Sequence, residues 1–147
     1  MDQYTAALVA QLKDCNNEKA KAALVPSLLA KDHTPLPNRL PAKSALHAVL
    51  SEHWCDPEVI SRLQELAQDN PKLRFRLLAI VMDEADPDDE RRKAAISALA
   101  ESLHVPIVQK KLCKIALSPK NSYVGSFTWA ILNKDAQSTA LANTLER

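Results

Sequence analysis

The stretch NPKLRFRLLAIVMDEADPDDERRKAAISALAESL, residues 70–103, contains two helical patterns separated by a short acidic junction. Asn70-Pro71 and Asp86-Pro87 each place a side-chain oxygen before a proline. This pairing is typical of a helix start, because the oxygen accepts an otherwise free backbone N–H and proline at the first helical position has no N–H to leave unpaired. The stretch therefore predicts two consecutive helices, and their short connection predicts that they run antiparallel.

Helical spacing of apolar residues continues over almost the whole chain. Asp56-Pro57 repeats the helix-start signal, and the run 77–82 is apolar nearly all round, which predicts a central, well-buried helix. Pro26 lies inside another helical pattern and is expected to kink or split it. The proline-rich segment 32–41 predicts the clearest loop. Together these signals predict eight or nine helices, which must pack on one another to be stable.

Composition favours an all-α fold in a single domain that covers residues 1–147. Hydrophobic residues make up 46% of the chain and aromatic residues only 4%, so Leu, Ala, Val and Ile must build the core. Gly125 is the single glycine, whereas sandwiches, barrels and nucleotide-binding sheets need many glycines in their turns and loops. Gly125 lies within a predicted helix, which indicates that a neighbouring helix or a partner approaches the backbone closely there.

A sequence echo indicates that one helix design is used more than once. RRKAAISAL, residues 91–99, and RLPAKSAL, residues 39–46, share the pattern R-x-x-A-x-S-A-L when Arg92 is aligned with Arg39. Arg74 begins a weaker third copy. Repetition of a helical unit along a chain is typical of helical-repeat proteins.

The echo resembles the HEAT and armadillo repeats, in which one helix begins with an aspartate and an arginine and continues with spaced alanines and a leucine. The residues that fit this pattern best are Asp89, Arg92, Ala95, Ala98 and Leu99. The resemblance implies a short right-handed α-solenoid of antiparallel helix hairpins. The copies are unequally spaced along the chain, so a compact helical bundle is the alternative architecture.

Charge and cysteine content favour a soluble protein of the cytoplasm. The formal net charge of +1 provides no strong overall field for nucleic acid. Cys15, Cys55 and Cys113 are odd in number and far apart, which favours a reducing compartment over a disulfide framework. The N-terminus lacks the pattern of a signal peptide, and no apolar run approaches the length of a membrane span. We therefore expect a cytoplasmic location and no membrane contact.

The segment EHWCD, residues 52–56, is the densest set of reactive side chains. His53 and Cys55 are the residues that would carry metal binding or nucleophilic catalysis. A metal site needs three or four ligands, however, and this spacing does not supply them. The alternative is that these residues end one helix and begin the next. We favour that interpretation and predict no catalytic residue, no metal and no cofactor.

The acidic junction DEADPDDE, residues 83–90, has two interpretations. Helix capping accounts for the later acids, which lie near the positive end of the helix dipole. Asp83 and Glu84 end the preceding helix, where acids are unfavourable, so the junction is also a candidate docking site for a basic protein surface. The candidate partner-binding residues are Asp83, Glu84, Asp86, Asp88, Asp89, Glu90 and, as an exposed anchor, Trp54.

The function predicted from these features is non-catalytic protein binding. One specific form is a small cytoplasmic immunity or inhibitor protein that neutralises a basic toxin, such as a nuclease, by direct contact. An adaptor or scaffold role fits equally well. Nucleic-acid binding through KLRFR, residues 72–76, and the lysines at 110, 111, 114 and 120 is a further alternative, which the small net charge and the few aromatic residues disfavour.

Overall fold

The computed structural model describes residues 3–15, 17–29, 45–83, 88–117 and 122–145, and all regular structure within them is helical. The all-α prediction is therefore confirmed. The helices are α1 (Gln3–Asp14), α2 (Glu18–Leu29), α3 (Ala45–Glu52), α4 (Pro57–Asp69), α5 (Pro71–Met82), α6 (Asp89–Ala98), the 3-10 helix η1 (Ala100–Ser102), α7 (Pro106–Ala116) and α8 (Ser122–Leu145).

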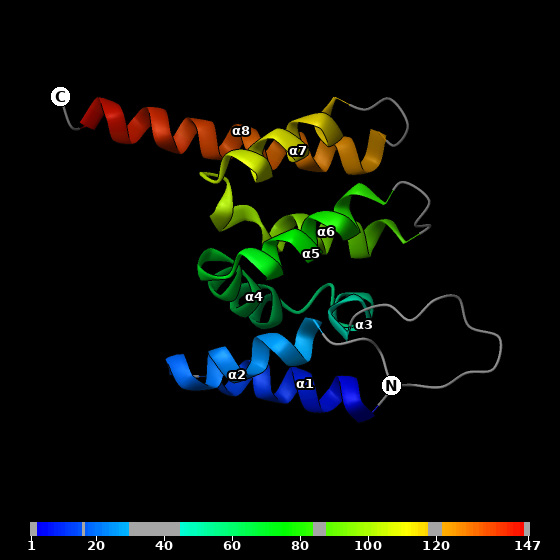
Figure 1. Ribbon diagram of the computed structural model, residues 1–147. Coiled ribbons are helices and arrows are strands. Elements are labelled where there is room, and N and C mark those ends of the chain that lie inside the picture. The colour runs from blue at the N-terminus through cyan, green and yellow to red at the C-terminus, as the bar shows by residue number, and fades with distance from the viewer. Residues whose placement is uncertain (1–2, 16, 30–44, 84–87, 118–121, 146–147) are drawn as a thin grey trace.

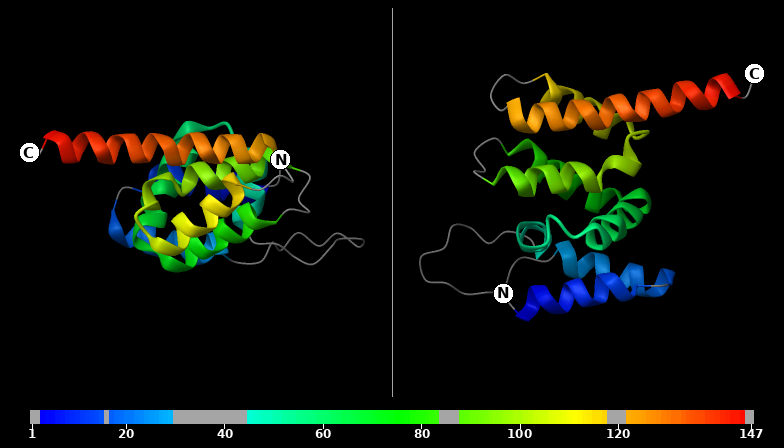
Figure 2. Two further views of the ribbon diagram at one scale, coloured as in Figure 1. Left: turned by 90° about the horizontal axis from the view of Figure 1, so that it is seen from above. Right: turned by 180° about the vertical axis from the view of Figure 1, so that it is seen from behind.

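The helices lie in successive layers, with α1 beside α2, then α3 and α4, then α5 and α6, and finally α7 and α8 (Figure 1). One flank of the stack is formed by α2, α5 and α7, in which α5 packs against both of the others. The opposite flank is formed by α1, α3, α6 and α8, and each of these helices packs on the next. The view from behind in Figure 2 shows this second flank. Helices that are distant in sequence are thus neighbours along each flank.

A single cluster of buried apolar side chains runs through all the layers. Because each helix contributes one apolar face to this cluster, no helix has to be stable by itself. The largest fully buried side chains are Leu12, Leu28, Leu46, Leu50, Leu63, Leu73, Leu77, Ile96, Leu99 and Leu112.

The start signals are correct for α4 and α5 and wrong for α6. Asp56 Oδ1 accepts the backbone N–H of the second helical residue of α4 at 3.1 Å, and Asn70 Oδ1 accepts that of Leu73 at 3.1 Å. The cap of α6 is Asp88, whose Oδ1 accepts the N–H of Arg91 at 3.0 Å, and not Asp86. Asp88 takes this role because it directly precedes the first helical residue, so its oxygen reaches the third N–H of the helix. Asp86 itself lies outside the described residues.

Pro26, which is expected to kink or split its helix, does not split it, since α2 continues through it from Glu18 to Leu29. Buried Leu24, Val25 and Leu28 hold both sides of the proline against the core. In α5 the run 77–82 is well buried as predicted, apart from exposed Ala79 and half-buried Met82, whereas the first half of the helix turns charged and aromatic side chains outward. The expected loop at 32–41 lies outside the described residues.

Arginine side chains cap the C-terminal ends of two consecutive helices in the same way. Arg74 Nη1 donates to the carbonyl oxygens of Ala67 and Gln68, in the last turn of α4, at 2.8 and 3.0 Å. Arg92 Nε and Nη2 donate to the carbonyl oxygen of Val81, in the last turn of α5, at 3.1 and 2.9 Å. Carbonyls in a last turn have no partner within their helix and lie at its negative end, so a guanidinium is well suited to them.

Asp56 links the first two layers and gives a testable dependence of stability on pH. Its second oxygen lies 2.9 Å from Lys13 Nζ of α1. The hydrogen bond from Lys13 lowers the pKa of Asp56 below its ordinary value of 3.8, and the backbone N–H groups of α4 lower it further. A carboxyl group whose pKa is lower in the folded state contributes stability that is complete above 3.8 and is lost as the pH falls through the folded value.

We predict that Asp56→Ala lowers the free energy of unfolding by about 1 kcal/mol more than Asp56→Asn, because asparagine keeps the capping oxygen. Both substitutions should remove the part of the acid dependence that Asp56 supplies. Urea unfolding at neutral and acidic pH measures both effects. Equal losses for the two variants would contradict the capping role.

Candidate functional site

The described acids of the junction all interact with their own chain. Asp88 caps α6 and lies 3.5 Å from Arg91 Nη1. Glu90 accepts a hydrogen bond from the Tyr123 hydroxyl at 3.0 Å, and Asp83 and Asp89 also have interactions within the chain. Capping and internal contacts thus account for these side chains. Docking of a basic partner at the junction stays a prediction, and Glu84 and Asp86 lie outside the described residues.

Glu90 belongs to a cluster that joins α6 to α8, which sequence reasoning missed. Lys93 Nζ donates to the Tyr123 hydroxyl at 2.7 Å and lies 3.7 Å from Glu90. It also lies 4.3 and 4.9 Å from the ring centroids of Tyr123 and Phe127, within the range of cation–π attraction. The hydrogen bond with Tyr123 raises the pKa of Lys93, so the amine is held as a cation. The cluster therefore links α6 to α8.

The reactive segment 52–56 forms the turn between α3 and α4. Cys55 and Trp54 are exposed there, and His53 Nε2 is buried with no hydrogen-bond partner among the described residues. Arg91 donates to the hydroxyl of Ser51, which brings the end of α3 next to the start of α6. The structure therefore places the turn that carries Trp54 near one end of the acidic junction. In the described ranges, no group of three or more His, Cys, Asp or Glu side chains is arranged to hold a metal ion.

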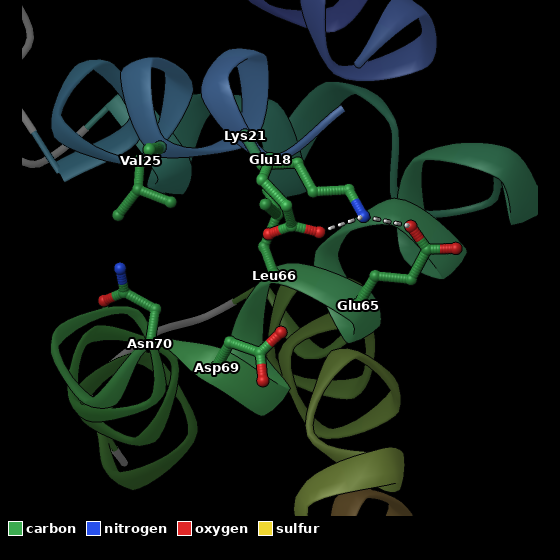
Figure 3. A pocket seen from close by; sticks show the side chains of 8 residues that line it. Glu18, Lys21, Val25, Glu65, Leu66, Asp69 and Asn70 are labelled. Atoms are coloured by element: carbon green, nitrogen blue, oxygen red, sulfur yellow. Dashed lines mark ion pairs between the residues drawn. The ribbon is translucent and has the colours of Figure 1, made fainter. Parts of the chain in front are cut away.

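An acidic pocket of about 150 Å³ lies between α2 and α4 (Figure 3). Its carboxylates are Glu18, Glu65 and Asp69, and its apolar floor includes Val25 and Leu66. Lys21 Nζ lies between two of the carboxylates, 3.7 Å from Glu18 and 3.9 Å from Glu65. The pocket suits a cationic group, and one lysine of the chain already occupies its edge.

The helices α5 and α7 carry a second charged surface, of opposite sign. Neither helix contains an acidic residue, and the two pack against each other on one flank. None of their outward cations forms an ion pair with a carboxylate in the part of the chain that the structure describes, whereas Lys13, Lys21 and Arg91 do. We call this surface the basic face; its cations are Lys72, Arg76, Lys110, Lys111 and Lys114.

Large apolar side chains are exposed on the same two helices. Phe75 is 70% exposed and lies one turn from Lys72 on α5. Leu117, directly after α7, is 77% exposed, and Ile107 is 50% exposed. Exposed apolar side chains with polar groups around them are typical of surfaces that bind another macromolecule.

The basic face could not be assembled from the sequence alone. The segments 72–76 and 110–114 were visible as two separate basic groups. Only the packing of α5 against α7 joins them, and only the described ion pairs show that carboxylates pair with Lys13 and Arg91 but with none of the cations of α5 and α7. The absence of any acid from both helices was visible in the sequence, but it does not show that the two helices are neighbours.

All regular structure in the described residues is helical, with an acidic pocket between α2 and α4 and a basic face on α5 and α7. Comparisons with family models, with curated proteins and with solved structures find no match for this chain. No helix in the described part combines the length and the apolar character needed to cross a membrane.

Proposed function

We propose that the chain is a non-catalytic protein-binding module, built as a short solenoid of antiparallel helix pairs, and that the basic face is its binding surface. The layered succession of helix pairs supports the solenoid assignment. The observation that carries the function is the set of cations on α5 and α7 that have no carboxylate partner among the described residues, together with the exposed apolar side chains of the same segments. A cytoplasmic location remains a prediction.

The partner that fits the basic face is an acidic protein segment with apolar side chains. Its carboxylates would pair with cations such as Arg76 and Lys110, and its apolar groups would cover Phe75 and Leu117. A single-stranded nucleic acid would use the cations and stack a base on the phenyl ring. It would have no comparable contact for aliphatic Leu117 and Ile107, so these side chains favour a protein.

The acidic pocket supports a second candidate function, which is inhibition of a basic partner such as a nuclease toxin. The carboxylates of Glu18 and Asp69 would receive a basic side chain of the partner if Lys21 turned outward from its ion pairs. This candidate differs from the first in the sign of the partner's charge. Lys21 already pairs with two carboxylates of the pocket, whereas no carboxylate among the described residues pairs with the cations of the basic face. We therefore rank the basic face first.

Fluorescence anisotropy with three labelled probes tests the assignment. The probes are a helical peptide with glutamates on one face and leucines on the other, its analogue with serine in place of leucine, and a single-stranded oligonucleotide. We expect the first peptide to bind most tightly, and the oligonucleotide to be released by about 150 mM salt. If the oligonucleotide bound more tightly than the peptide at that salt concentration, the partner would be a nucleic acid and not a protein. Binding of a basic peptide alone would favour the acidic pocket.

A further inference from the structure

The outward side of α8 has a different character from the basic face. Its inward side carries Val124 and Thr128, which are fully buried, and Phe127, which packs against the core. On the outward side, Trp129 is 59% exposed. Ser126, Ala130 and Asn133 are exposed beside it at helical spacing, so this side is uncharged and has one large aromatic group among small ones.

The second half of α8 extends beyond the other helices that the structure describes. α8 has 24 residues and α7, its partner in the last layer, has only 11. Both figures show α8 continuing well past the other helices (Figures 1 and 2). Helices gain most of their stability from packing, and a short isolated segment is only marginally helical in water. A surface that packs on the projecting half would therefore stabilise it.

We propose that α8 pairs with α8 of a second copy of this chain in an antiparallel, two-fold symmetric dimer. An axis near the middle of the helix would lay the projecting half of each copy along the first half of the other, where Trp129 is exposed. One arrangement thus covers both the exposed indole and the projecting half. This pairing is self-complementary, as a two-fold interface must be.

Charge is consistent with a second copy as the occupant. Within α8 only Lys134 and Asp135 are charged, one of each sign, so two copies would not repel each other along this helix. A strongly charged partner would find no complement on the outward side. The proposal does not depend on the proposed function, because α8 lies on the opposite flank from α5 and α7.

Sedimentation equilibrium at protein concentrations of about 1 to 100 μM tests the dimer. The full chain should approach twice its mass of 16.2 kDa. Trp129→Lys should raise the dimer dissociation constant at least about 30-fold, while Trp129→Phe should retain most of the association. The matched control Phe75→Lys places the same charge on α5 and should leave the dimer unchanged.

Amide hydrogen exchange gives a second measurement. Protection of the second half of α8 should be present in the dimer and lost in Trp129→Lys, with protection elsewhere unchanged, which also shows that the variant is folded. A chain that stays monomeric over the whole concentration range would overturn the proposal. So would a dimer that survives Trp129→Lys, or one that Phe75→Lys dissociates.

Discussion

Replacing Arg92 by alanine is expected to lower the free energy of unfolding by about 3 to 4 kcal/mol, the largest loss we predict for a single substitution. The side chain is 2% exposed, and both of its described hydrogen bonds go to the carbonyl of Val81. Truncation removes a charged donor from the end of α5 and leaves a cavity beside Ala95 and Ile96, which are themselves fully buried. For a chain of this size the loss corresponds to a melting temperature lower by roughly 6 to 16 °C.

Two comparisons separate the capping role of Arg92 from simple burial. Arg92→Met keeps most of the volume but no donor, so it should lose nearly as much stability as the alanine variant if the hydrogen bonds dominate. Arg91→Ala removes the adjacent, more exposed guanidinium, which pairs with Asp88 and donates to Ser51, and should cost less stability than Arg92→Ala. Chemical denaturation measures all three variants. A fully stable Arg92→Met would show that packing alone explains the site.

Reversing two charges of the basic face is expected to weaken binding of the acidic, leucine-bearing peptide at least about 30-fold. The variant combines Arg76→Glu on α5 with Lys110→Glu on α7. Both side chains are exposed and neither has an ion pair among the described residues, so the fold should not depend on them. The reversal replaces attraction by repulsion at the site of contact.

The matched control combines Lys19→Glu with Lys134→Glu. These lysines are also exposed, on α2 and α8, and the change in net charge is identical. The control should weaken peptide binding less than about 3-fold, because its charges lie away from the contact and are screened by salt. Equal losses in the two double variants would mean that net charge, and not the basic face, governs binding.

The local parts of the fold could be predicted from the sequence. A cap such as Asp56 or Asn70 acts on N–H groups within three residues, so its effect is encoded beside it. The same reasoning failed at Asp86, because several acids follow one another there and the one that caps is decided by where α6 begins. The apolar stripe of each helix was also readable, since burial follows helical periodicity.

The candidate site depends on contacts that local signals do not encode. Arg92 and Arg74 were visible as members of a repeated pattern, yet their shared role appears only when each meets the carbonyls of the preceding helix. Lys93 and Tyr123 are 30 positions apart and come together through the packing of α6 on α8. The basic face likewise needs α5 and α7 to be neighbours, which no pattern in either helix specifies.

Titration of the ¹⁵N-labelled chain with the acidic, leucine-bearing peptide, followed by amide chemical shifts, tests most directly whether the basic face is the binding surface. We predict that the shifted amides cluster on α5 and α7, around Phe75 and Lys110, and that the shifts disappear in the double variant of the basic face. Shifts centred on the acidic pocket between α2 and α4, or spread evenly over the chain, would contradict the account.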